Sequence, residues 1–122
     1  MSKKVLIVDD SQAELHLMQS MLQQGGFHSV GISDPTRIEE AIEEERPNVI
    51  LLDVVMPRRN GFQACRDLKS QQPYSNIPVI LVSGAQGASA RDSHGDLFSA
   101  IFDKPYDRKA MLKAVADLLD CP

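Results

Sequence analysis

The sequence predicts an α/β domain in which a doubly wound, five-stranded parallel sheet carries helices on both faces. Five short apolar runs alternate with five amphipathic or polar stretches along the chain. Each parallel crossover requires an intervening helix, so the alternation itself favours this architecture. Two of the runs, Val49–Leu52 and Val79–Val82, are unbroken apolar segments typical of central strands that are covered on both faces. The length of 122 residues predicts one domain spanning residues 1–122.

The composition excludes several classes of function. Thirteen basic residues against seventeen acidic ones give a net charge of −4, whereas a nucleic-acid binder usually carries a basic excess. The longest apolar runs are far shorter than the about 20 residues that cross a bilayer. We expect no signal peptide, because two carboxylates, Asp9 and Asp10, interrupt the first apolar segment. The two cysteines, Cys65 and Cys121, make no CxxC pair and no disulfide framework. We therefore expect a cytoplasmic protein with no membrane partner and no direct nucleic-acid partner.

The first strand and the first helix are predicted close to the N-terminus. Lys4–Val8 is an apolar run typical of a strand, and Ser11–Gln24 has the apolar periodicity of a helix. Ser11, followed three residues later by Glu14, predicts a capping box at the start of this helix. Gly25-Gly26 then supplies the left-handed geometry that ends it.

The second strand is predicted over Phe27–Ile32, where a mixture of His, Ser and Gly favours a position at the edge of the sheet. Asp34-Pro35 predicts an N-cap followed by proline at the first helical position. The helix that follows is expected to end before Pro47. Its inward face is predicted to consist of Ile38, Ala41 and Ile42.

The third strand, Asn48–Asp53, is predicted to be buried on both faces because its apolar run is unbroken. Asn60-Gly61 is a turn signal after this strand. A third helix follows the turn, and its apolar stripe is predicted to consist of Phe62, Cys65 and Leu68.

The last part of the chain predicts two more strands and a closing helix. Ile77–Val82 is a second strand of the central type, and Ser99–Asp103 is a shorter fifth strand. The stretch between them, Ala85–Gly95, has poor helix content because each glycine costs about 1 kcal/mol relative to alanine. Tyr106–Leu119 is predicted as the last helix, with inward-facing Met111, Val115 and Leu118.

Polar side chains follow four of the predicted strands. Asp9 and Asp10 follow the first strand, Asp53 ends the third, Ser83 follows the fourth and Lys104 follows the fifth. Ligands of such sheets bind outside the carboxyl ends of the strands, so we expect these residues to converge there. Carboxylates suit Mg²⁺, and a lysine and a hydroxyl can hold phosphoryl oxygens. One carboxylate can also be the nucleophile that accepts the phosphoryl group.

Five short motifs carry these residues: Val-Asp-Asp at 8–10, Asp-Val-Val-Met-Pro at 53–57, Asn-Gly at 60–61, Ser-Gly-Ala at 83–85 and Lys-Pro at 104–105. In this order and spacing they resemble the receiver domain of two-component response regulators. Each motif alone is common, but the resemblance covers essentially the whole chain. It implies a flavodoxin-like strand order, 2-1-3-4-5.

The resemblance also implies the phosphoacceptor and the metal ligands. Asp53 matches the phosphoacceptor of the family. Asp9 and Asp10 match the acidic pair that holds Mg²⁺, one directly and the other through water. The backbone carbonyl of Val55 is expected to complete the protein's share of the metal shell.

Two further residues match family positions that contact the phosphoryl group. Ser83 matches the switch hydroxyl that contacts a phosphoryl oxygen. Lys104 matches the lysine that pairs first with Asp53 and then with the phosphoryl group. Pro105 matches the residue that shapes this loop, and we expect a cis Lys104–Pro105 bond, since cis is inexpensive only before proline.

The sequence departs from the family pattern at the output face. The family usually carries an aromatic residue three positions before the lysine, where this chain has Ile101. Phe102 is next in sequence and is expected to point to the opposite side of the strand. We therefore expect the segment Gly84–Asp96, rather than an aromatic side chain, to respond when Ser83 contacts the phosphoryl group.

The implied function is that of a phosphoacceptor signalling module and not of a turnover enzyme. A histidine kinase or a phosphotransfer protein donates the phosphoryl group, and a downstream protein target reads the result by protein–protein contact. The family positions that orient or block hydrolytic water are Val55 and Ala85 here, and neither side chain can hydrogen-bond. Slow self-dephosphorylation is therefore expected.

Individual residues disfavour three alternative functions. A haloacid dehalogenase-type aspartyl-phosphate phosphatase needs an acid/base Asp two positions after its nucleophile, where this chain has Val55. A flavin carrier with a flavodoxin-like sheet needs a phosphate loop rich in Ser, Thr or Gly after the first strand, where Asp9-Asp10 would repel a phosphate. A degenerate receiver that takes no phosphate is disfavoured by the complete set of acidic, hydroxyl and lysine residues.

Overall fold

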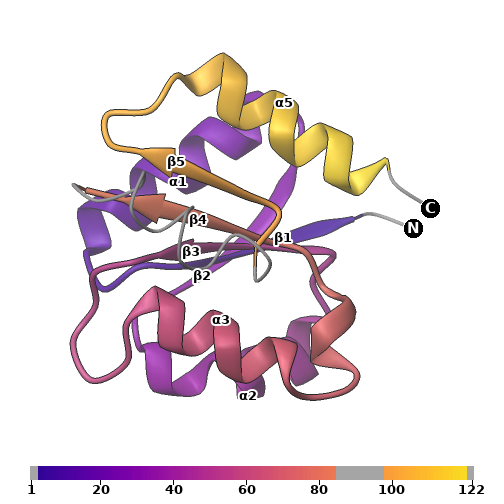
Figure 1. Ribbon diagram of the computed structural model, residues 1–122. Helices are drawn as coiled ribbons and strands as arrows, with labels where there is room; N and C mark the ends of the chain where they lie inside the picture. The colour runs from indigo at the N-terminus through magenta and orange to yellow at the C-terminus, as the bar shows by residue number, and fades with distance from the viewer. Residues whose placement is uncertain (1–2, 85–97, 121–122) are drawn as a thin grey trace.

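The computed structural model describes residues 3–84 and 98–120 and folds them around one parallel sheet (Figure 1). The five strands lie in the order β2-β1-β3-β4-β5, and every neighbouring pair is parallel. The predicted doubly wound sheet and its strand order are confirmed, with β2 at one edge. The strands are β1 (Lys4–Val8), β2 (His28–Ile32), β3 (Val49–Asp53), β4 (Val79–Ser83) and β5 (Ala100–Asp103).

Helices cover both faces of the sheet (Figure 1): α2 and α3 lie on one face, and α1 and α5 on the other. Within the described ranges, no helix is both long and apolar enough to cross a membrane. The stretch Ala85–Gly95, for which poor helix content was predicted, lies outside the described residues. The helices are α1 (Gln12–Gln24), α2 (Ile38–Glu45), α3 (Gly61–Lys69) and α5 (Arg108–Leu119), with short 3-10 helices η1 (Pro35–Arg37) and η2 (Tyr74–Asn76).

The core has two layers because successive residues of each strand point to opposite faces of the sheet. In β1, Leu6 and Val8 belong to the layer of α2 and α3, whereas Val5 and Ile7 belong to the layer of α1 and α5. Every residue of β3 and of β4 is buried, as predicted for central strands.

The buried stripe of α5 differs from the prediction at one position. Met111 and Val115 are buried as expected, but the third buried residue is Leu119. Leu118 is only partly buried against the same core layer. Residues spaced by four lie on one face of a helix, so Leu119 continues the stripe of Met111 and Val115.

The cap at the start of α1 also differs from the prediction. Ser11 Oγ accepts a hydrogen bond from the Glu14 amide at 3.3 Å, which is the expected half of a capping box. The predicted second bond, from the Ser11 amide to the Glu14 side chain, is wrong, because the Ser11 amide donates to Asp9 Oδ1 at 2.9 Å. A complete capping box occurs at α3, where Asn60 and Gln63 exchange both bonds. The predicted turn at Asn60-Gly61 is therefore the start of a helix.

Strand β4 begins at Val79, two residues later than predicted. Proline has no amide hydrogen to donate to a neighbouring strand, so Pro78 does not continue the ladder. The carbonyl of Pro78 still accepts from the Ile50 amide at 3.0 Å. The carbonyl of Ile77 is taken instead by Lys69 Nζ at 2.7 Å.

Candidate functional site

The parallel register brings the predicted site residues to one edge of the sheet. Asp53 is the last residue of β3 and Ser83 is the last residue of β4. Asp9 follows β1 directly, and Lys104 follows β5 directly. Asp53 pairs in register with Val82, the residue before Ser83. The strand ends therefore assemble a site from residues that are far apart in the sequence.

Three carboxylates form the acidic part of this site. Asp9, Asp10 and Asp53 each offer one carboxylate oxygen, and these atoms lie within 4.8 Å of one another. Asp9 is 1% exposed and Asp53 is 5% exposed, while Asp10 is exposed to solvent. The structure thus brings together the three carboxylates that the sequence analysis selected.

Lys104 supplies the opposite charge. Its Nζ lies 3.5 Å from Asp53 Oδ1 and 3.9 Å from Asp9 Oδ2. Its backbone amide donates to the carbonyl of Ser83 at 2.7 Å, which ties the end of β5 to the end of β4. The Lys104–Pro105 bond is cis, as predicted. The ammonium group is therefore held directly beside two of the three carboxylates.

Ionising the crowded carboxylates is unfavourable. Burial and then the charge of Asp9 raise the pKa of Asp53 to about 6, although Lys104 opposes the shift. Burial also raises the pKa of Asp9, against the hydrogen bond from the Ser11 amide and the attraction of Lys104. Burial lowers the pKa of Lys104, but Asp53 and Asp9 outweigh it and raise the pKa overall. A further positive charge at this site would relieve the repulsion between the aspartates.

The donor set fits a hard divalent cation. Asp9 Oδ1 accepts from the Ser11 amide, but the buried Asp9 Oδ2 has no hydrogen-bond partner among the described residues. Buried polar atoms normally have a hydrogen-bond partner. A buried carboxylate oxygen without one, beside two other carboxylates, therefore indicates that Asp9 Oδ2 binds a cation. Mg²⁺ prefers oxygen ligands and binds through a small number of carboxylates.

The other predicted site residues are placed by the strands that they end or follow. Val55 follows β3 and is 70% exposed. Ile101 is buried in the layer of α2 and α3, whereas Phe102 packs against the layer of α1 and α5, so their predicted opposite directions are confirmed. Gly84 is exposed, with open space where a side chain would begin. Ala85 and the remainder of the predicted responding segment lie outside the described residues.

The loop Val54–Asn60 between β3 and α3 packs closely behind Asp53. The Gly61 amide donates to the carbonyl of Val54 at 2.8 Å. A side-chain carbon at Gly61 would stand 2.5 Å from the carbonyl oxygen of Asp53, so only glycine fits without a shift of the backbone. The start of α3 therefore lies against the backbone of the candidate phosphoacceptor.

The side chain that anchors this loop belongs to none of the sequence motifs. Arg59 forms ion pairs with Glu39 of α2 and Asp67 of α3. A local pattern could not reveal these contacts because they join three separate elements. The available signals in the sequence were the adjacent pair Arg58-Arg59 and the acidic run at 39–45.

A groove of about 640 Å³ adjoins the site between α1 and the segment after β5. Leu17 of α1 exposes a large apolar side chain there. Lys104 and Tyr106 also line the groove. Lys104 is thus shared between the acidic cluster and an open apolar surface.

Comparison with known sequences identifies the family. Residues 5–116 match the response regulator receiver domain. The chain is 32% identical over 121 residues to protein PilH of Pseudomonas aeruginosa, and the match covers 95% of this chain and 97% of PilH. It is 36% identical over 92 residues to the response regulator PleD of Caulobacter vibrioides, which covers 75% of this chain and 20% of PleD.

Comparison with solved structures agrees on the fold. The Vibrio cholerae chemotaxis protein CheY4 matches with a TM-score of 0.86 at 23% identity, covering 97% of this chain and 99% of that chain. The receiver domain of the P. aeruginosa sensor histidine kinase PA1611, which coordinates a magnesium ion in its active-site cleft, matches with a TM-score of 0.86 at 19% identity. That match covers 99% of this chain and 100% of the other. The sequence motifs, the strand order and these relatives lead to one conclusion: the chain belongs to the response regulator receiver domain family of two-component signalling.

Proposed function

We propose that this receiver domain accepts a phosphoryl group on Asp53 and transmits the signal by protein–protein contact. The observation that carries the proposal is the position of Asp53, which ends β3 with its carboxylate 3.5 Å from Lys104 Nζ and close to the carboxylates of Asp9 and Asp10. With a pKa of about 6, Asp53 is ionised at neutral pH. Its carboxylate is then a nucleophile available to an electrophilic phosphorus atom.

The transfer makes one bond and breaks one. An Asp53 oxygen forms a bond to phosphorus while the bond from phosphorus to a histidine nitrogen of the donor breaks. Lys104 offsets the negative charge that the phosphoryl oxygens bring to the site. We assign to the hydroxyl of Ser83 the contact with one phosphoryl oxygen after transfer.

The acidic cluster suits the metal that such a transfer requires. Asp9, Asp10, Asp53 and the backbone carbonyl of Val55 would hold Mg²⁺, whose charge, when it is bound, offsets that of the phosphoryl oxygens. The buried, unsatisfied Asp9 Oδ2 and the raised pKa of Asp53 both support a cation at this position.

The donor is proposed to be a histidine kinase or a phosphotransfer protein, and the recipient a downstream protein. The groove beside Lys104, with the exposed Leu17, supports access by a protein to this side of the site. Because the phosphoryl group ends on the protein's own side chain, the domain acts as a signalling component and not as a turnover enzyme. The phosphatase alternative remains disfavoured, since an exposed valine occupies position 55.

Phosphorylation by a small donor tests the proposal directly. Incubation with acetyl phosphate and Mg²⁺ should add one phosphoryl group per chain, detected by intact-protein mass and located by peptide mapping on Asp53. Chelation with EDTA should prevent the reaction, because the site's own carboxylates repel the incoming phosphoryl oxygens. Modification of a different residue, or labelling that is indifferent to EDTA, would contradict the assignment.

The phosphorylated protein should lose its phosphoryl group slowly. The exposed Val55 cannot orient a water molecule by hydrogen bonding, so general-base assistance, worth about 100-fold or more, is missing at this position. Release of inorganic phosphate from the purified, phosphorylated protein should take minutes or longer. A half-life of a few seconds would show that another group activates water.

A polar side chain at the same position provides the comparison. Val55→Gln places a hydrogen-bonding group on the same exposed surface and should shorten the lifetime, by up to about 100-fold. Leu17→Gln changes an exposed apolar residue of α1 in the same way and should leave the lifetime unchanged.

A further inference from the structure

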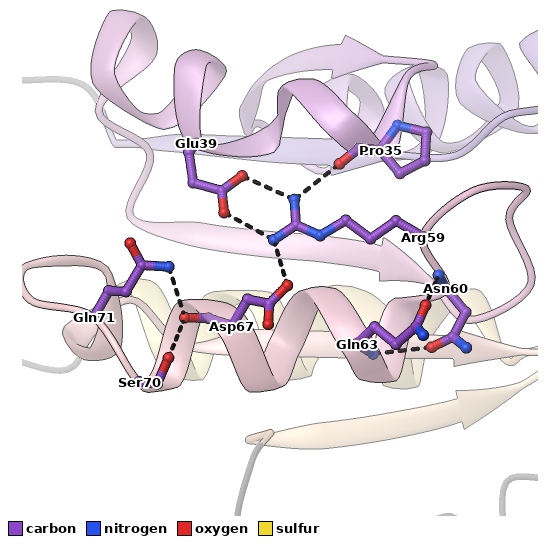
Figure 2. A network of polar contacts seen from close by, with 8 residues as sticks. All are labelled: Pro35, Glu39, Arg59, Asn60, Gln63, Asp67, Ser70 and Gln71. Carbon is purple, nitrogen blue, oxygen red and sulfur yellow. Dashed lines mark hydrogen bonds and ion pairs between the residues drawn. The ribbon is translucent and has the colours of Figure 1, made fainter.

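Arg59 connects the loop behind Asp53 to three other elements (Figure 2). Its Nη1 donates to the carbonyl of Pro35 at 3.1 Å and to Glu39 Oε1 at 2.8 Å. Its Nη2 donates to Glu39 Oε2 at 2.8 Å and to Asp67 Oδ2 at 3.0 Å. One side chain from the loop thus joins η1, α2 and α3.

The pairing of Arg59 with Glu39 differs from an ordinary surface ion pair. The Arg59 side chain is only 14% exposed, and its pairing with Glu39 is bidentate. Bidentate, charge-assisted bonds fix direction as well as distance. The hydrogen bonds from Arg59 are the main reason that the pKa of Glu39 is lowered. Glu39 also raises the pKa of Arg59 through the same bonds.

The loop can transmit this anchoring to the site because it is short and closed on itself. The Gly61 amide returns to the Val54 carbonyl at 2.8 Å, and the Arg59 amide donates to the Pro57 carbonyl at 2.7 Å. Arg58 has a left-handed backbone, with φ of 69°, and its guanidinium lies 3.4 Å from Asp34 Oδ1. Asp53 therefore leads directly into a segment whose far end is held by two arginines.

We propose that Arg59 is a positioning residue, which holds the loop Val54–Asn60 against α2 and α3 and thereby fixes the Val55 carbonyl and the Asp53 carboxylate for metal binding. The inference rests on the proposed function, because it concerns the same site. Arg59 contacts neither the metal position nor the phosphoryl group in this scheme. Its effect is on the geometry of the ligands and not on the chemistry of transfer.

The test separates metal affinity from the transfer step. In Arg59→Met, the Mg²⁺ concentration that half-saturates the protein should rise about three- to tenfold, as measured by NMR titration. The loss of a residue that hydrogen-bonds to a metal ligand typically weakens metal binding by about 10- to 100-fold, and Arg59 acts less directly. The maximal rate of labelling by acetyl phosphate at saturating Mg²⁺ should stay close to that of the wild type. Without metal, the amides of residues 54–61 should exchange faster than in the wild type, while those of α5 should not change.

Three further variants control for simple loss of structure. Arg59→Lys retains the positive charge but cannot form the bidentate pairing with Glu39. Its Mg²⁺ affinity should therefore lie between those of the wild type and Arg59→Met. Glu39→Gln removes the bidentate partner and should reproduce the effect, and it can replace Arg59→Met if that variant does not fold. Arg66→Met removes an exposed arginine of α3 that lines the same surface and should bind Mg²⁺ like the wild type.

Two different failures can be told apart. If the wild type binds no Mg²⁺ and takes no phosphoryl group, the proposed function itself is wrong. If the wild type does both, but folded Arg59→Met and Glu39→Gln keep its Mg²⁺ affinity, the positioning role of Arg59 is overturned. A fall in the maximal labelling rate without a change in Mg²⁺ affinity would also overturn it.

Discussion

Asp53→Asn should reduce phosphorylation by acetyl phosphate by at least about 100-fold, the largest effect expected of any single change in this protein. The amide group is uncharged and is a poor nucleophile toward phosphorus, whereas its size is almost that of the carboxylate. Intact-protein mass spectra recorded over time at saturating Mg²⁺ would measure the loss.

A neighbouring carboxylate provides the matched control for this variant. Asp10→Asn makes the same chemical change within the acidic cluster but leaves the proposed nucleophile in place. Its labelling should be slow at low Mg²⁺ and recover when the Mg²⁺ concentration is raised. Labelling of Asp53→Asn at the wild-type rate on another residue would show that the nucleophile was wrongly assigned.

The same Asp53→Asn variant should be more stable than the wild type at pH 7.5 in EDTA, by about 2–3 kcal/mol. The pKa of Asp53 is raised from 3.8 to about 6 in the folded protein, so the folded state binds a proton more tightly than the unfolded chain does. Stability contributed by this group is therefore present below pH 4 and is lost as the pH rises through 6. Asp53→Asn has no carboxyl to ionise, so its stability does not fall in this way as the pH rises.

Urea unfolding at two pH values would measure the difference. The gain of Asp53→Asn should be present at pH 7.5 and almost vanish at about pH 3, where the wild-type carboxyl is largely protonated in both the folded and the unfolded state. Asp117→Asn removes the same charge from an exposed pair with Lys113 and should change the free energy of unfolding by only a few tenths of a kcal/mol at either pH. An equal gain at both pH values would contradict the electrostatic explanation.

Most of the fold could be predicted because its signals are local. The unbroken apolar runs identify β3 and β4, and the alternation of strands and helices predicts the parallel sheet. Two of the errors occur where a side chain takes a backbone group that the regular sequence pattern assigns elsewhere. The amide of Ser11 is taken by Asp9 instead of Glu14, and the carbonyl of Ile77 is taken by Lys69. Sequence spacing alone cannot rank such competitors.

The acidic, hydroxyl and lysine residues of the candidate site were predictable for a topological reason. Parallel strands end at the same edge, so a residue at each strand end is placed once the sheet order is known. Arg59 was not predictable in this way, because its partners lie on η1, α2 and α3 and are brought together only by the packing of the helices. The raised pKa of Asp53 likewise depends on burial and on neighbours from other strands.

The close packing of Gly61 against the backbone of Asp53 affects how genetic screens of this protein should be interpreted. Even alanine at position 61 would force the start of α3 away from the carbonyl oxygen, which stands 2.5 Å from where the methyl group would lie. Loss-of-signal alleles at this codon will therefore arise from a displaced backbone, although position 61 donates no side chain to any partner. A mutational scan for partner-binding residues must correct for such alleles. Otherwise it will assign Gly61 to the interaction surface, although the only requirement at this position is a small residue.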